Sequence, residues 1–166
     1  MAYQVTDTVI GNQAIATTST TQLHPVGTIV RAKDSTYGEG EFIYLIGVAS
    51  TIVGSIVSYT DGDTLVGQTA LATTTVTKGE PLAVAMSANV AAAYGWYQIS
   101  GVAVMGKANT LSVAPDVDIA IASGLVIAAA TTNRVSGAVT SITASAKTDV
   151  ITVPVLIDRP RGPGVA

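Results

Sequence analysis

Two pairs of carboxylates have a spacing that could support acid–base chemistry. Glu39 and Glu41 are two residues apart, and so are Asp116 and Asp118, so each pair would lie on one face of a strand. Paired carboxylates act as general acid and base in glycoside hydrolysis. The same spacing is typical of solvated side chains beside turns, where ion pairs with neighbours such as Arg31 contribute little stability. We favour the surface role and keep a polysaccharide-degrading enzyme as an alternative.

The other motifs that resemble catalytic or ligand-binding signatures are incomplete. Residues 101–107 spell the GxxxxGK of a phosphate-binding loop, but Ala108 stands where Ser or Thr would bind magnesium. We interpret this stretch as a bent strand that ends in a turn. Residues 61–63 (Asp-Gly-Asp) predict a tight turn rather than a calcium loop, because no bidentate Glu follows at the required distance. His24, the only histidine, has no acidic or Ser neighbour to orient it. The sequence therefore predicts a protein that is not an enzyme and holds no cofactor or metal.

Aromatic residues gather at Tyr94, Trp96 and Tyr97. Alternation along a strand would send Trp96 and Gln98 to one face and Tyr97 and Ile99 to the other. An exposed aromatic platform could stack against a sugar, which makes these three aromatic residues a candidate glycan site. A core anchor with one hydrogen-bonded polar edge is the commoner role of such a Trp, and we favour it.

The composition excludes several classes of protein. The chain has 166 residues, which suits one domain, with eight basic and eleven acidic residues and no Cys. Disulfide and thiol chemistry are impossible, and the net charge of −3 gives no electrostatic footprint for nucleic acid. Residues 42–60 and 82–106 carry no charge, but Gly and polar residues interrupt them, so we expect no membrane span. A surface with so few charges suggests contact with another protein.

Short β-branched and aromatic runs separated by Gly-rich turns recur along the chain, which is typical of a sandwich or a barrel. The run 41–46 is apolar on both faces and predicts a central strand. Gly101 inside the run 94–105 predicts a bulge or a bend. Only residues 88–93 favour a short helix. We expect an all-β fold, a small β-barrel or β-sandwich with extended N- and C-terminal arms. The predicted strands are 28–32, 41–46, 52–59, 81–86, 94–105, 125–130 and 150–157, with a long hairpin or loop over 131–149.

The two ends of the chain differ from the middle. Residues 1–24 are polar and low in charge and predict an extended N-terminal arm, which the sequence His24-Pro25 closes. Residues 25–157 would form the β domain, and residues 158–166, with two prolines, an irregular C-terminal tail. We expect the arms to contact a neighbouring protein by strand addition. The candidate contact residues are Val5, Val9, Ile10, Ile15, Leu23, His24, Arg159 and Arg161.

Four stretches resemble small structural proteins of tailed bacteriophages, of the capsid decoration (cement) or head-fibre type. They are GTIVRAKDST at 27–36, YGEGEFIYL at 37–45, AVAMSANV at 83–90 and YGWYQISG at 94–101. The resemblance covers about residues 23–110 and includes no catalytic residue.

The resemblance implies a virion protein on the capsid surface, made in the host bacterial cytoplasm. Its partners would be the major capsid protein and neighbouring copies of itself, as dimers or trimers at symmetry axes. Its function would be to cement capsomer joints against the pressure of packaged DNA. The alternative is a head-fibre module that binds a receptor or a host surface glycan.

Overall fold

The computed structural model describes residues 4–5, 13–60, 67, 69–73, 79–108, 112, 114–129, 133–141 and 152–162. These residues form twelve strands and no helix, which confirms the predicted all-β class. The strands are β1 (Gln4–Val5), β2 (Thr18–Ser19), β3 (Ile29–Asp34), β4 (Gly38–Ile46), β5 (Ile56–Tyr59), β6 (Thr69–Leu71), β7 (Leu82–Ala85), β8 (Tyr94–Gly106), β9 (Ile119–Ala122), β10 (Leu125–Ala128), β11 (Ser136–Thr140) and β12 (Thr152–Arg161).

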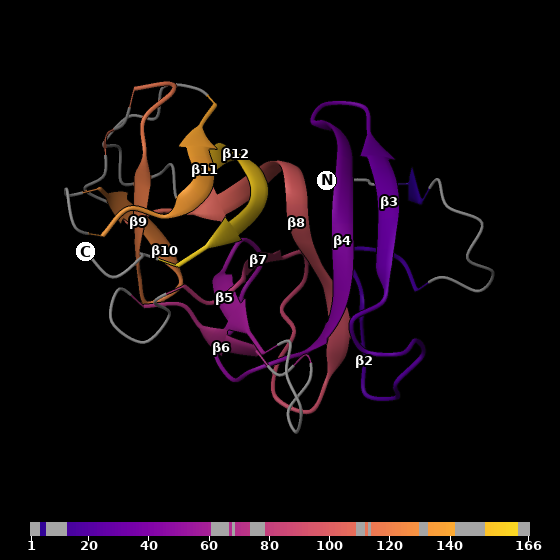
Figure 1. Cartoon of the computed structure of the whole chain (residues 1–166). Helices are drawn as coiled ribbons and strands as arrows, with labels where there is room; N and C mark the ends of the chain where they lie inside the picture. The colour runs from indigo at the N-terminus through magenta and orange to yellow at the C-terminus, as the bar shows by residue number, and fades with distance from the viewer. Residues whose placement is uncertain are drawn as a thin grey trace.

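Ten of these strands form one antiparallel sheet with the order β1-β3-β4-β8-β7-β5-β6, to which β12, β11 and β2 are joined through β8. The remaining two, β9 and β10, form a separate hairpin. The sheets do not close into a barrel, and the arrangement is that of a sandwich. In Figure 1, β3, β4 and the first half of β8 lie on one side of the molecule, and β9 to β12 lie on the other.

The long strand β8 joins the two sides because it changes partners along its length. Its first half pairs with β4, and its second half, residues 100–106, pairs with β12. Ser100 is opposite both Glu41 and Asp158, so the change occurs there. The next residue, Gly101, has φ +96°, and a Cβ at this position would collide with the carbonyl oxygen of Glu39. The bend predicted at Gly101 is therefore confirmed, and it requires glycine.

The curved sheet buries three apolar clusters. Strand β7 is buried at every position, because Leu82 and Val84 pack against β9 to β12 while Ala83 and Ala85 pack against β4 and β8. The side chains of β4 also alternate between two buried clusters, with Phe42 and Tyr44 on one face of the strand and Ile43 and Leu45 on the other. Its predicted central position, between β3 and β8, is confirmed.

Most predicted strands are present with shifted ends. The run 52–59 is a strand only over Ile56–Tyr59, because residues 53–54 make a turn in which Gly54 has φ +85°. Within 131–149, residues 136–140 form β11 and pair with β12 as a hairpin. The helix favoured for residues 88–93 is absent. A helix this short is unstable alone, and the backbone here bonds elsewhere, with the N–H of Gly47 donating to the carbonyl oxygen of Ala93.

The prediction of an irregular tail from residue 158 is wrong for residues 158–161. These residues continue β12 past residue 157, where we expected the domain to end. Ile157 pairs with Ala138 and Arg161 pairs with Ser136, so residues 158–160 bulge opposite Gly137. Proline is tolerated in a strand at a bulge, since no ladder hydrogen bond needs its missing N–H, and this accommodates Pro160.

The N-terminal region is also more integrated than an arm. Residues 13–24, which we call the N-terminal strap, lie on the sheet, and β2 within the strap pairs with the start of β8. Near the chain start, β1 pairs with Lys33 and Ala32 at the edge of β3. The strap and β1 therefore dock on the chain's own sheet.

Candidate functional site

The aromatic residues of β8 are part of the core. Trp96 and Tyr97 are fully buried, and Tyr94 is partly buried. Trp96 Nε1 donates to the carbonyl oxygen of Gln13 at 2.9 Å, so its polar edge is satisfied by the strap. The core interpretation of Trp96 is confirmed. A glycan platform made of Tyr94, Trp96 and Tyr97 is not formed, because no sugar could reach the two buried rings.

Two buried phenols in this region have shifted titration. Burial raises the pKa of Tyr97 although hydrogen bonds from Asn89 and Thr69 oppose the shift, with Asn89 Nδ2 lying 2.9 Å from the phenol oxygen. Burial also raises the pKa of Tyr44, against a hydrogen bond from the backbone of Leu23. Both side chains stay neutral in the fold and serve as hydrogen-bonding parts of the core.

The predicted N-terminal contact residues do not form one surface. Ile15 is 3% exposed and His24 is 8% exposed, so the expectation that they contact a neighbour is corrected, because the chain's own sheet covers them. Leu23 is 53% exposed and remains accessible. Val5 lies in β1 opposite Ala32. Val9 and Ile10 lie outside the described residues.

The predicted C-terminal contact residues, Arg159 and Arg161, are exposed but bind within the chain. Arg159 Nη2 lies 2.8 Å from Glu41 Oε2. Arg161 Nη1 donates to the carbonyl oxygen of Gly79 at 3.0 Å. Arg159 has φ +43°, a conformation that side-chain-bearing residues rarely adopt and that lies within the bulge of β12. The bulge therefore places the Arg159 guanidinium beside β4.

A polar cavity of about 610 Å³ lies where the end of β12 meets β3 and β4. Glu41 is central to it, because Arg31 Nε lies 3.4 Å from its Oε1 while Arg159 contacts its Oε2. Glu39 also lines this cavity, and so does Asp158. The cavity has the donors and acceptors of a site for a hydroxyl-rich ligand.

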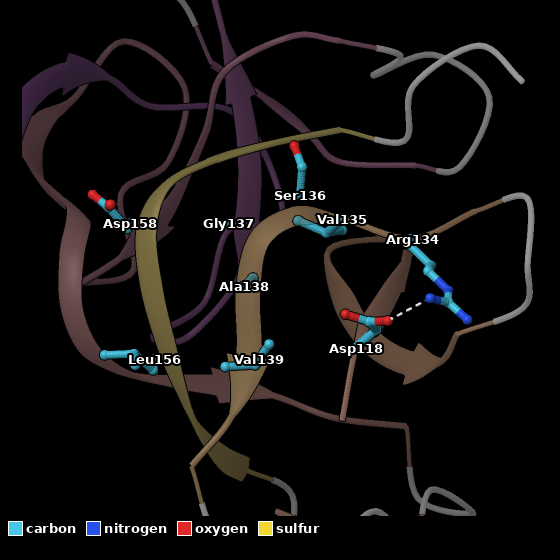
Figure 2. Close-up of a pocket in the computed structure, with 9 residues that line it drawn as sticks. All are labelled: Asp118, Arg134, Val135, Ser136, Gly137, Ala138, Val139, Leu156 and Asp158. Atoms are coloured by element: carbon cyan, nitrogen blue, oxygen red, sulfur yellow. Dashed lines mark ion pairs between the residues drawn. The ribbon is translucent and has the colours of Figure 1, made fainter. Parts of the chain in front are cut away.

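A second cavity of about 440 Å³ lies beside β11 and β12. Figure 2 shows Asp118 paired with Arg134 at one margin, at 2.8 Å. Asp116 is in a turn with φ +57°. The four carboxylates considered for acid–base chemistry therefore do not form one cluster. Glu39 and Glu41 both line the polar cavity, whereas Asp118 lines this second cavity. Among the described residues, no group of three or more His, Asp or Glu side chains could hold a metal ion.

The phosphate-loop pattern is a strand, as expected. Gly101 and Gly106 both lie within β8, and Lys107 is 2% exposed. Residues 107–108, which lead out of β8, have no helical structure, so the described residues offer no helix N-terminus here that could face a phosphate. Residues 61–63 lie outside the described residues.

The outer side of β8, β12 and β11 carries a set of apolar side chains. Leu156 lies opposite Val102 on one neighbouring strand and opposite Val139 on the other, which makes a row across three strands. Pro154 pairs with Val104 in the next row. Leu156 is 49% exposed, and the other four are partly exposed. We call these five residues the outer apolar face.

Alternation explains the outer apolar face. The intervening residues of β8 and β12, among them Ala103, Met105 and Val155, point inward to the core. The run 150–157 is apolar on both faces in the sequence, which is the signal that could have revealed a second buried or binding side. Val53, which is also exposed, lies near the end of β8. The N–H of Gly106, the last residue of β8, donates to the carbonyl oxygen of the neighbouring Gly54 at 2.9 Å.

The part of the chain with assigned structure includes no helix that is long and apolar enough to cross a membrane. Comparison of the chain with protein-family models, with curated proteins and with solved structures found no match in any of the three.

Proposed function

We propose that this chain is a structural protein of a bacteriophage virion that binds the outside of an icosahedral head and stabilises the joints between capsomers. The observation that supports the proposal most directly is the outer apolar face, where exposed Leu156 lies in one row between the partly exposed Val102 and Val139 on three hydrogen-bonded strands. Contiguous apolar surface of this kind marks sites of protein contact. The sequence resemblance to decoration and head-fibre proteins points to the same class of partner.

The proposed mechanism is burial of this face against the major capsid protein. Each square ångström of apolar surface removed from water contributes about 25 cal/mol. A protein that binds the assembled shell more tightly than free subunits shifts the equilibrium toward the shell, which is how a cement protein would stabilise it. Repeated copies, as dimers or trimers at symmetry axes, would add avidity.

The contact surface differs from the one we expected for the arms. Ile15 and His24 are buried within the chain, and Arg159 is engaged with Glu41. Of the contact residues predicted on the strap, Leu23 stays exposed, and the proposal places the capsid contact instead on the outer apolar face around Leu156.

A receptor- or glycan-binding head fibre is the second candidate function, and the polar cavity favours it. Arg31, Glu41 and Arg159 converge there and could form paired hydrogen bonds with vicinal hydroxyls. This site replaces the aromatic platform as the place where a glycan would bind.

The first experiment is quantitative mass spectrometry of gradient-purified particles of the source phage. The measured quantity is the number of copies of this chain per copy of major capsid protein. A ratio of one, or a simple fraction of one set by the symmetry axes, is the expected result. A few tens of copies would favour the fibre, and absence from particles would contradict the proposal.

The contact surface is tested with two matched variants. Leu156 and Leu23 are similarly exposed, at 49% and 53%, but lie on β12 and on the strap respectively. We expect Leu156→Lys to weaken binding to particles stripped of this protein by at least about tenfold, or ~1.4 kcal/mol. Leu23→Lys should bind as the wild type does. The reverse result would move the capsid contact to the N-terminal strap, and circular dichroism confirms that both variants fold.

A further inference from the structure

The outer apolar face is bordered by a row of polar side chains. This row crosses four hydrogen-bonded strands, β3, β4, β8 and β12, and contains Arg31, Glu41, Ser100 and Asp158. On β12, Asp158 follows Leu156 of the outer apolar face by two residues. Side chains at this spacing leave a strand on the same face, roughly 7 Å apart, and Figure 2 shows both on one side of β12. The polar row and the outer apolar face are therefore one continuous surface.

Asp158 lies where two cavities meet. It lines the cavity of about 440 Å³ beside β11, together with Leu156 and Val139. It also lines the polar cavity of about 610 Å³, together with Ser100 and Glu41. Both Leu156 and Asp158 are exposed. A partner that covers Leu156 therefore also covers Asp158.

The arginines of the polar cavity do not neutralise Asp158. Both are directed at Glu41, with Arg159 Nη2 at 2.8 Å from its Oε2 and Arg31 Nε at 3.4 Å from its Oε1. Within the part of the chain that the structure describes, no ion pair includes Asp158. Its carboxylate is charged and depends on water for its solvation.

Glu39 adds another carboxylate to the polar cavity. Its cross-strand neighbour on β3 is Lys33, but these two described residues form no ion pair, and Lys33 does not line the cavity. Three carboxylates and two guanidinium groups thus line the polar cavity, with one negative charge in excess. Complementary charge favours a cationic group in this cavity over an anionic one.

Covering Asp158 without a counter-charge would oppose binding. A carboxylate that loses its water must gain a paired cation or hydrogen bonds, otherwise its desolvation cost remains. Lysine and arginine meet this need, and their apolar stems can lie along apolar surface while the charged end reaches the carboxylate. A partner that buries Leu156 is therefore favoured when it also brings one of these two side chains.

We infer that the docking segment of the partner presents an apolar side chain to Leu156 and a lysine or arginine side chain to Asp158. The inference rests on the proposed function and names the chemistry of the capsid-protein segment that would bind. In an extended segment the two side chains would be two residues apart, since that spacing matches the spacing of Leu156 and Asp158 along β12.

Binding to particles stripped of this protein, measured at low and at high salt, tests the inference. Asp158→Asn keeps the shape of the side chain and removes its charge. We expect it to weaken binding about threefold at low salt, and the double variant Asp158→Asn, Glu39→Gln about tenfold. Both differences from the wild type should nearly vanish at about 1 M salt, where charges are screened within about 3 Å. Leu156→Ala should bind more weakly at both salt concentrations.

Asp116→Asn is the matched control. Asp116 is exposed, lies in a turn and lines neither cavity, so this variant removes the same charge away from the proposed contact. It should bind as the wild type does at both salt concentrations. Circular dichroism confirms that all variants fold.

The remaining outcomes overturn the inference. Equal binding of Asp158→Asn and the wild type at low salt would mean that the partner brings no cation to this carboxylate. A loss that high salt leaves unchanged would indicate a neutral, hydroxyl-rich ligand such as a glycan. Weaker self-association of Asp158→Asn in sedimentation velocity would assign the surface to contact between copies of the chain. If the wild type does not bind stripped particles, the proposed function itself is wrong, and the inference falls with it.

Discussion

Three consecutive side chains of β8 illustrate what single residues do in this fold. Trp96, Tyr97 and Gln98 are fully buried although each has a polar group. Trp96 donates to the carbonyl oxygen of Gln13, the Tyr97 phenol accepts from Asn89, and Gln98 Nε2 donates to two carbonyl oxygens of its own strand. A buried polar group without a partner is costly, so the bond of Trp96 fixes how the strap sits on the sheet, and the bond of Tyr97 fixes the loop before β8.

The raised pKa of Tyr97 predicts a loss of stability at alkaline pH. The unfolded chain ionises its tyrosines at about pH 10, whereas the buried phenol of Tyr97 keeps its proton to higher pH. The unfolded state therefore holds fewer protons than the folded state in that range, and the free energy of unfolding falls as the pH rises above about 10. At neutral pH this contribution is fully present.

Urea unfolding of Tyr97→Phe at pH 8 and above about pH 10 measures this effect. We expect the variant to lose about 1–3 kcal/mol at pH 8, because Asn89 loses its acceptor. Between pH 8 and alkaline pH, the free energy of unfolding should fall less in the variant than in the wild type. The fall that remains in the variant comes from Tyr44, whose pKa is also raised by burial. Tyr37→Phe, in the turn between β3 and β4, is the control and should keep the wild-type profile. An equal alkaline loss in Tyr97→Phe and the wild type would contradict the prediction.

At the scale of elements, β8 determines the architecture because it pairs with β4 before its bend and with β12 after it. Gly101 at the bend has φ +96° and lies against Glu39 and Gly40. One residue therefore lets a single strand serve both sides of the sandwich.

Substituting this glycine should be costly for two separable reasons. Gly101→Ala places a Cβ against the carbonyl oxygen of Glu39 and forces a residue with a side chain to adopt a positive φ. Gly38→Ala imposes a similar φ of +77° with no atom within 4 Å of the new Cβ. We expect the conformational cost of about 1–3 kcal/mol in both variants, and an additional loss only in Gly101→Ala. Thermal and urea unfolding measure the difference, and equal losses would argue against the steric contribution.

At the scale of the whole molecule, the two sides are also joined by side chains. Glu41 on β4 contacts Arg159 on β12, two residues 118 positions apart in the chain. Arg31 on β3 shares the same carboxylate. Both arginines are exposed, so water and salt screen the attraction, and an ion pair of this kind contributes little.

We expect a double-mutant cycle of Glu41→Gln and Arg159→Gln to give a coupling energy below about 1 kcal/mol. The coupling should shrink further in high salt, because the charges are screened. Urea unfolding of the wild type, both single variants and the double variant measures it. A coupling above about 2 kcal/mol, or one that salt leaves unchanged, would mean that the pair is less solvated than its exposure indicates.

Features that depend on a local pattern could be predicted from the sequence, whereas features that depend on distant residues could not. The strands at 41–46, 81–86 and 94–105 and the bend at Gly101 were predictable, because β-branched alternation and an interior Gly are local signals. The continuation of β12 through Pro160 was not, since it depends on a bulge opposite Gly137, a residue 23 positions earlier. The prediction that Ile15 and His24 contact a neighbouring protein was wrong, because the burial of these two side chains depends on strands far along the chain.

The amino-acid sequence by itself determined the all-β class, the central place of β4, the core position of Trp96 and the absence of thiol chemistry. These features follow from residue type and from a period of two along the chain. The tertiary structure decided which apolar faces stay exposed, which carboxylates share a cavity, and that the strap closes over Trp96. Such features depend on pairing between residues up to 118 positions apart, and no local pattern encodes which distant strand will be the partner.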